Sequence, residues 1–418
     1  MSKRKLMVRV RPAWLALLAL MIALPALAAP PAPSGRQLDK QQLAQILGPR
    51  LRQVLSGQPL QAYSPRWGAL VVEPAISPYL QREAEELLAG LKSPRAALAV
   101  VEIPSGRVLA LAGERNGRLD PSVALDASSP AASLYKIVTA AAAVEETQLN
   151  PMSRMSFTGR PHSLTPGQVK ISQPRKSAQA TLRESFAVSN NPVFAKLGVY
   201  HIGGDLLTWY GKALGFESRL PFELPLGVSR LADCSTDFDV AGLASGYNTE
   251  TTISTVHAAL LAGVFVNQGR LVEPYVVARA SDPAGNVLYQ GRPASLGRIV
   301  SPTTCRAMQE MFEATITEGT ARKAFTRLGQ DRILRDISLG GKTGTMGGPD
   351  KTELFEWFAG YGRDEQSGRT IAVSAVVVHH SIRYANAKQL SRQILRSAFA
   401  AGGTHVVSQP SFRHAPRL

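Results

Sequence analysis

Strand-like runs of apolar residues lie toward both ends of the chain. Residues 96–102 (AALAVVE) and 107–112 (RVLALA) are short apolar runs, and the four residues between them, IPSG, are typical of a turn. This pattern predicts a β-hairpin. An amphipathic pattern with a helical period precedes it at residues 77–91. Strand-like runs return late in the chain at residues 338–345, 356–361 and 370–379, and a helical pattern follows at 385–400.

Helical patterns dominate the middle of the chain. They cover residues 130–149, 181–200, 204–214, 251–268 and 301–317. Strands at both ends of a sequence, around a helical middle, imply one sheet to which both ends contribute. We therefore predict an α+β (mixed α/β) fold, with an antiparallel sheet built from both ends of the chain, flanking helices, and a mainly helical subdomain in the middle.

The first 28 residues have the pattern of a secretory signal peptide. Five bases and no acid precede an apolar run at 13–24, which proline and the small-residue sequence ALA follow at 25–28. Residues 13–29 also approach the roughly 17–25 residues that span a bilayer, so an uncleaved membrane anchor stays an alternative. Both interpretations predict export, to the periplasm or to the outer face of the cytoplasmic membrane.

Composition divides the rest of the chain into three parts. Residues 29–66 begin with APPAPSG and contain a short helical pattern broken at Gly48-Pro49, so we predict a linker there. Residues 67–400 hold the main strand and helix patterns and are predicted to form one domain. Residues 401–418 are predicted to be a basic tail.

The charge of the chain is unevenly distributed. Among 418 residues, 47 Lys+Arg against 31 Asp+Glu give a formal net charge of +16. Five bases belong to the N-terminal signal, and residues 366–418 contain seven Arg and Lys and no acid. A solvated basic helix and tail explains that segment, and attraction to an anionic cell-envelope surface is the alternative. Export, and the lack of interleaved basic and aromatic residues, argue against a nucleic-acid partner.

Cysteine and histidine do not suggest a metal centre. Cys234 and Cys305 are compatible with a disulfide in an oxidising compartment, and equally with burial as small apolar residues. The seven histidines are scattered apart from His379-His380, and the sequence has no H-E-x-x-H motif or Cys/His cluster. We therefore predict no metal site and no cofactor.

The first of three short motifs with candidate chemistry is Ser133-Leu-Tyr-Lys136, near the start of the predicted helix 130–149. Residues three apart share a helix face, so the lysine amine can reach the serine hydroxyl. The helix N-terminus also favours developing negative charge. This arrangement suits a nucleophilic serine with a lysine base. Alone the motif is weak, because Ser2 and Lys5 repeat it inside the signal.

Two further motifs strengthen this interpretation. The only S-x-N of the chain lies at 189–191, where the helical stretch 181–188 gives way to 192–200; by itself it is a plausible helix cap. The only K-T-G lies at 342–344 on a predicted strand, and it cannot belong to a phosphate loop because Asp336 occupies the position of the first glycine. The three motifs together, in this order, make coincidence improbable.

This motif set resembles that of the penicillin-binding protein and serine β-lactamase superfamily. The hairpin at 97–112 and the sequences EGTA at 318–321 and WFAGY at 357–361 also look like segments of a penicillin-binding transpeptidase domain, which would correspond to residues 67–400. The resemblance implies an acyl-transfer fold with its site between the sheet and the helical subdomain.

The resemblance implies a role for each residue of the first two motifs. Ser133 would attack the carbonyl of a D-Ala-D-Ala stem peptide of peptidoglycan and release the terminal D-Ala, while Lys136 takes its proton. Burial and the positive charge of Lys342 would lower the pKa of the Lys136 amine. Ser189 would relay a proton toward the leaving amine, and Asn191 would hold Lys136 and the substrate amide.

The third motif would bind the end of the substrate. By the same resemblance, Lys342, Thr343 and Thr345 would bind the terminal carboxylate. Gly344 would let the substrate backbone lie beside the strand. The backbone N–H groups of Ser133 and Thr345 would form an oxyanion hole.

Within the superfamily we predict a D,D-transpeptidase, with a D,D-carboxypeptidase or a non-catalytic penicillin sensor or scaffold as alternatives. A class A β-lactamase is disfavoured because its E-x-x-L-N sequence occurs here at 146–150, before S-x-N instead of after it. Residues 29–66 are too few for the N-terminal pedestal of division-type transpeptidases, and the length leaves no room for a glycosyltransferase. The predicted partners are peptidoglycan stem peptides, β-lactams and cell-wall synthesis proteins. Because the pedestal is missing, we do not expect the last group to dock through such a pedestal.

Overall fold

The computed structural model describes residues 37–170, 177–350, 352–380, 382–383 and 385–400. The predicted export signal at 1–28 and the predicted basic tail at 401–418 therefore lie outside the described residues. Within the described ranges, no helix has the length and apolar character needed to cross a membrane.

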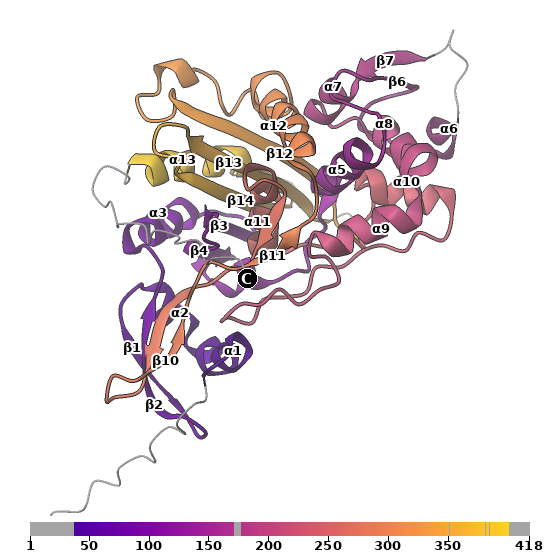
Figure 1. The fold of residues 1–418 in the computed structure, drawn as a ribbon. Coiled ribbons are helices and arrows are strands. Elements are labelled where there is room, and N and C mark those ends of the chain that lie inside the picture. Colours follow the sequence, from indigo (N-terminus) through magenta and orange to yellow (C-terminus); the bar gives the residue numbers. More distant parts are fainter. Residues whose placement is uncertain (1–36, 171–176, 351, 381, 384, 401–418) are drawn as a thin grey trace, which may run out of the picture.

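The centre of the molecule is a six-stranded sheet in which neighbouring strands are antiparallel (Figure 1). Its strand order is β12-β13-β14-β3-β4-β5, so the late strands continue directly into the early hairpin. The predicted antiparallel sheet built from both ends of the chain is thereby confirmed. The strands are β3 (Arg95–Ile103), β4 (Val108–Arg115), β5 (Arg118–Leu119), β12 (Ile337–Gly347), β13 (Leu354–Asp364) and β14 (Thr370–His379).

Helices cover both faces of this sheet, which explains why its strands are apolar runs rather than alternating sequences. Helices α3 (Pro78–Leu88) and α13 (Ala387–Ala400) pack on one face, and α11 (Thr255–Gly263) packs on the other. Along β3, Leu98 and Val100 join the core of α3 and α13, whereas Ala97, Ala99 and Val101 join the core of α11. Because successive side chains of a strand point to opposite faces, both sets must be apolar. Helix α12 (Pro302–Thr317) lies beside β12.

The middle of the chain forms the predicted helical subdomain (Figure 1). The predicted interruption of the helical stretch 181–200 lies at Ser189, whose φ of +61° no α-helix can accommodate. The subdomain consists of α5 (Lys136–Glu146), α6 (Pro166–Val169), α7 (Leu182–Ala187), α8 (Asn191–Lys196), a π-helix (Leu197–Ile202), α9 (Gly204–Ala213), α10 (Asp237–Ser245) and the strand pair β6 (Arg154–Phe157) and β7 (Ala178–Thr181).

The prediction that residues 29–66 form a linker is wrong for residues 40–64. This segment folds into α1 (Lys40–Leu47), α2 (Leu51–Leu55) and β1 (Leu60–Ser64), and the side chains of Leu43 and Leu47 are fully buried. Strand β1 pairs with β2 (Gly68–Pro74), and that sheet continues through β9 (Val277–Ser281) to β10 (Val287–Gln290). The partner strands come from about two hundred residues later in the sequence, so a local pattern could not reveal the sheet.

The remaining described elements are short. They are α4 (Ser122–Leu125), the strand pair β8 (Arg270–Val272) and β11 (Ser295–Arg298), and the 3-10 helices Gly48–Arg50, Ala132–Tyr135, Val264–Val266 and Leu328–Gln330.

The disulfide alternative for the two cysteines is wrong, because both are free thiols. Cys305 is buried in α12, and burial raises the pKa of its thiol to about 11. Cys234 is half-buried beside the hydroxyl of Thr208 in the helical subdomain. The two residues thus belong to different parts of the fold.

Candidate active site

Ser133 lies in the 3-10 turn that leads into α5, and the backbone around it is tightly held. The preceding residue, Ala132, has a φ of +50°, a conformation that L-residues other than glycine rarely adopt. The N–H of Ala131 donates to the carbonyl of Thr251 at 2.7 Å. Gly246 packs so closely against this turn that a Cβ there would lie 2.0 Å from the Ala132 oxygen. These contacts fix the half-buried Ser133 in one place.

Lys136, one helical turn after Ser133, is fully buried and its amine has three oxygen partners. Its Nζ lies 2.7 Å from Ser133 Oγ, 2.6 Å from Asn191 Oδ1 and 2.5 Å from the carbonyl oxygen of Ser245. The structure therefore brings together the first motif, the last residue of the second motif, and the C-terminal end of α10.

The partners of Lys136 determine what its neutral form can do. A neutral amine has two N–H donors and one lone pair. The amide oxygen of Asn191 and the backbone oxygen of Ser245 can only accept hydrogen bonds, so they use the two donors. The lone pair is then left for the Ser133 hydroxyl, the one partner that can donate. This geometry is the one required for proton transfer from serine to lysine.

Burial makes the neutral form of this lysine accessible. Desolvation lowers the pKa of Lys136 well below that of an exposed lysine, and the positive charge of Lys342 lowers it further. Burial alone lowers the pKa of Lys342 to about 7. Two buried amines close to each other cannot both easily hold a proton near neutral pH.

Ser189 and Lys342 form a second serine–lysine pair. Ser189 occupies the loop between α7 and α8, and its Oγ accepts a hydrogen bond from Lys342 Nζ at 3.0 Å. The same amine donates to the carbonyl oxygen of Thr343 at 2.8 Å. The second and third motifs are thus in direct contact.

Two phenylalanines flank the amines at matching helical positions. The Lys342 Nζ lies 5.5 Å from the ring centroid of Phe186, three residues before Ser189. The Lys136 Nζ lies 5.6 Å from the ring centroid of Phe194, three residues after Asn191. An aromatic face attracts a cation and excludes water. Both rings therefore shield the amines from solvent and still stabilise whichever amine is protonated.

The K-T-G residues lie on β12, the edge strand of the central sheet nearest the Ser133 turn. A Cβ at Gly344 would lie 3.3 Å from both the Ala131 oxygen and the Ala132 Cβ, so glycine allows the strand to approach this turn closely. Thr343 is buried and Thr345 is exposed. Behind them, Trp357 on β13 donates its indole N–H to the carbonyl of Pro130 at 2.8 Å, which holds the sheet against the turn.

Three contributors to the site were missed by the sequence motifs. The Ser245 carbonyl could not be predicted, because any residue type supplies a backbone carbonyl and no sequence motif marks it. Thr320, whose hydroxyl lies 2.5 Å from that of Thr343, belongs to the EGTA sequence, for which the motifs predict no role. His162 lies on the loop before α6, where desolvation lowers its pKa, the positive charges of Lys136 and Lys342 lower it further, and a hydrogen bond to the Ser189 backbone opposes the shift.

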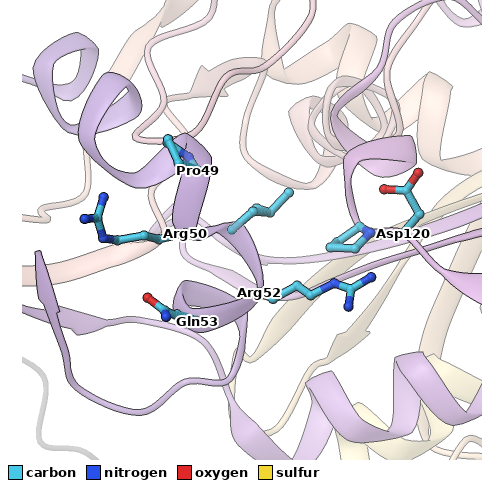
Figure 2. A pocket seen from close by; sticks show the side chains of 7 residues that line it. Pro49, Arg50, Arg52, Gln53 and Asp120 are labelled. Atoms are coloured by element: carbon cyan, nitrogen blue, oxygen red, sulfur yellow. The ribbon is translucent and has the colours of Figure 1, made fainter.

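Other features do not contribute to this constellation. Glu146, from the E-x-x-L-N sequence, accepts a hydrogen bond from the Tyr210 hydroxyl at the end of α5. Among the described residues, no group of three or more His, Cys, Asp or Glu could hold a metal ion. A pocket of about 350 Å³ lies between α2 and the start of α4 (Figure 2), and one of about 560 Å³ lies beside α1. Neither is lined by a motif residue.

Comparison with a family model places most of the chain in one known domain. Residues 96–399 match the model described as the penicillin binding protein transpeptidase domain. This range contains all three motifs and the central sheet except the first residue of β3, Arg95.

The curated relatives share only about a quarter of their aligned residues with this chain, and they are longer than it. Stage V sporulation protein D of Bacillus subtilis is 26% identical over 216 residues, which is 51% of this chain and 32% of that protein. Penicillin-binding protein PbpB of Mycolicibacterium smegmatis is 24% identical over 294 residues, 66% of this chain and 44% of that protein. The matches with these relatives thus cover less than half of their length.

Solved structures share the fold. The D,D-transpeptidase domain of a peptidoglycan glycosyltransferase from Eggerthella lenta has a TM-score of 0.66 at 21% identity, covering 84% of this chain and 91% of that one. Penicillin-binding protein A of Mycobacterium tuberculosis, in its ceftriaxone acyl-enzyme complex, has a TM-score of 0.64 at 20% identity, covering 86% and 84%.

Proposed function

The chain belongs to the penicillin-binding protein transpeptidase family, and on this premise we propose that it is a serine D,D-transpeptidase. It would cross-link peptidoglycan stem peptides through an acyl-enzyme on Ser133, and β-lactams would acylate the same residue. The observation that carries the proposal is the set of hydrogen-bond partners of Lys136: among the described residues, the Ser133 hydroxyl is the only partner that can donate to the lone pair of its amine.

In the acylation step, the oxygen of Ser133 forms a bond to the carbonyl carbon of the penultimate D-Ala, and its proton passes to Lys136. The negative charge on the substrate oxygen is stabilised by the backbone N–H groups of Ser133 and Thr345. Each such donor contributes roughly 3–4 kcal/mol in other acyl-transfer enzymes. The peptide C–N bond then breaks, and the leaving D-Ala nitrogen receives a proton through Ser189.

Deacylation reverses the proton path. The amine of a second stem peptide attacks the ester carbon, loses a proton to the site, and the Ser133 oxygen leaves and recovers its proton from Lys136. Asn191 holds both Lys136 and the substrate amide during these steps. If water attacks in place of the amine, the same chemistry is that of a D,D-carboxypeptidase.

The C-terminal carboxylate of the donor peptide is recognised by the K-T-G strand. Lys342 supplies positive charge, Thr343 and Thr345 supply hydroxyl groups, and Gly344 leaves space for the substrate backbone beside the strand edge. Because the substrate is part of the cell wall, we place the reaction outside the cytoplasmic membrane, which agrees with the predicted export signal. Docking to cell-wall synthesis proteins is part of this proposal.

The enzyme proposal is tested with a fluorescent penicillin. The native protein should form a covalent adduct that peptide mapping places on Ser133, and Ser133→Ala should abolish it while keeping the thermal unfolding midpoint. Absence of an adduct on the folded wild-type protein would contradict the enzyme proposal and favour a non-catalytic scaffold.

The reaction type is tested by product analysis. The mature protein is incubated with a pentapeptide ending in D-Ala-D-Ala and with an acceptor amine, and the products are separated by mass. Cross-linked peptide with released D-Ala is the expected outcome. Release of D-Ala with tetrapeptide alone would make the protein a D,D-carboxypeptidase.

A further inference from the structure

Thr320 connects the second and third motifs, although it belongs to neither. It follows α12, in the loop that leads toward β12, and its backbone N–H donates to the carbonyl oxygen of Ala187 at 3.0 Å. Ala187 is the last residue of α7, two residues before Ser189. The Thr320 hydroxyl lies 3.3 Å from the same carbonyl oxygen and 2.5 Å from the hydroxyl of Thr343.

The loop that carries Thr320 is fixed in place on both sides. A Cβ at Gly319 would lie 2.2 Å from the Ala187 oxygen, so only glycine permits this approach. The neighbouring Glu318 receives two hydrogen bonds, of 2.8 and 2.7 Å, from the guanidinium of Arg183 on α7. Paired bonds of this kind fix orientation as well as distance. The contact between Thr320 and Thr343 is therefore built into the fold.

The hydroxyl protons of Thr320 and Thr343 have two possible arrangements. If Thr320 donates to Ala187, then Thr343 must donate to Thr320, and Thr343 offers only lone pairs to a ligand. If Thr320 donates to Thr343, then the Thr343 proton is free for a ligand. The Ala187 oxygen keeps its bond from the Thr320 backbone N–H in both cases. Switching between the two arrangements therefore leaves no buried acceptor without a hydrogen bond, and the free-energy cost of the switch is small.

We propose that Thr320 is a positioning residue that switches Thr343 from acceptor to donor when a substrate carboxylate binds. This inference rests on the proposed function, in which the K-T-G strand recognises the C-terminal carboxylate. The hydroxyl of Thr320 then donates to Thr343, which donates to the carboxylate. Chains of hydrogen bonds aligned in this way strengthen one another. Thr320 thus contributes to the preference for a free carboxylate over a neutral end.

The test compares two acylating probes that differ only at this group, benzylpenicillin and its methyl ester. The second-order rate of adduct formation is measured by intact-protein mass spectrometry for wild type, Thr320→Val, Thr320→Ser and a control, Thr317→Val. Thr317 is exposed at the end of α12, and among the described residues its hydroxyl donates a hydrogen bond only to the Glu313 carbonyl of the same helix. Thermal unfolding of each variant is measured in parallel.

We expect the preference for the free carboxylate to fall about five- to tenfold in Thr320→Val, the value of one such hydrogen bond. Thr320→Ser and Thr317→Val should keep the wild-type ratio. An unchanged ratio in Thr320→Val, or an equal loss of rate with both probes, would overturn the inference, since a merely structural residue affects both alike. If Thr320→Val does not fold, Thr320→Ala gives the same comparison. A wild-type protein that neither probe acylates would refute the proposed function itself, and the inference with it.

Discussion

The amine of Lys136 lies 2.7 Å from the hydroxyl oxygen of Ser133, and its other two partners, the Asn191 amide oxygen and the Ser245 carbonyl, can only accept hydrogen bonds. This arrangement aims the lone pair of the neutral amine at the serine proton. It needs no further residue to define the base, and it depends on the lysine being fully buried. Burial and proton transfer are therefore linked in this site.

Replacing Lys136 with methionine should remove the base and keep the fold. Methionine has a similar volume and no charge to bury, which offsets the loss of the hydrogen bonds to Asn191 and Ser245, so the stability should stay close to that of wild type. We expect the rate of acylation by penicillin to fall by about 10²–10⁴-fold, the usual contribution of general base catalysis. Lys212→Met, on the exposed side of α9, is the matched control and should react normally. A Lys136→Met rate within tenfold of wild type would contradict this role.

The two buried lysines should make the protein more stable as the pH rises above neutral. The folded-state pKa of Lys342 is lowered from 10.5 to about 7, and that of Lys136 is also lowered. Between the folded and unfolded pKa values the unfolded state binds more protons, so the free energy of unfolding increases with pH. Each lysine contributes a slope of about 1.4 kcal/mol per pH unit in that window.

Urea unfolding between pH 7 and 9.5 measures this slope. In Lys342→Met one of the two titrating amines is absent, so the rise in unfolding free energy with pH should be clearly smaller than in wild type. Equal slopes in the two proteins would mean that Lys342 keeps its ordinary pKa in the folded state.

Gly246 should be required both for stability and for acylation. Its φ is +62°, and a Cβ would lie 2.0 Å from the carbonyl oxygen of Ala132, the residue before Ser133. Gly246→Ala must therefore shift the nucleophile turn or the neighbouring Ser245 carbonyl that holds Lys136. Gly285 has a φ of +90°, and a Cβ there would meet no atom within 4 Å, so Gly285→Ala carries the backbone strain without the clash.

We expect Gly285→Ala to cost about 1 kcal/mol of unfolding free energy, the strain of a left-handed L-residue, and to leave acylation unchanged. Gly246→Ala should cost clearly more and slow acylation by penicillin. Similar losses of stability in both variants, with normal acylation, would show that the close approach at Gly246 is not needed.

The sequence predicted most of the central sheet because its signals are local. Strands β3 and β14 are buried on both faces and appear as continuous apolar runs. Their position at both ends of a helical middle predicted one shared sheet, but not the order of its strands. The three short motifs at 133–136, 189–191 and 342–344 were also visible locally. What no motif could show is which acceptors surround Lys136, because the Ser245 carbonyl and the contact of Thr343 with Thr320 depend on segments that meet only in the folded chain.

The linker prediction for residues 40–64 is wrong for a related physical reason. The helical pattern around Leu43 and Leu47 is short, Gly48-Pro49 breaks it, and a helix of this length has little stability alone. Its stability must come from packing, and here α1 packs against β1, whose sheet is completed by β9 and β10 from far along the chain. Gly48 and Pro49 are typical of a linker in the sequence, but in the structure they form the junction between the packed helices α1 and α2.

This correction leads to a prediction for Leu43, which has no exposed surface in α1. If residues 40–64 are an integral part of the fold, then Leu43→Ala leaves a cavity and should lower the free energy of unfolding by about 2–5 kcal/mol. Leu296→Ala is the matched control, because Leu296 on β11 is 43% exposed and the same atoms are removed with little loss of packing. Urea unfolding followed by circular dichroism measures both. A segment that merely tethers the domain would instead make the two substitutions equally mild, and a Leu43→Ala effect below about 1 kcal/mol would restore the linker interpretation.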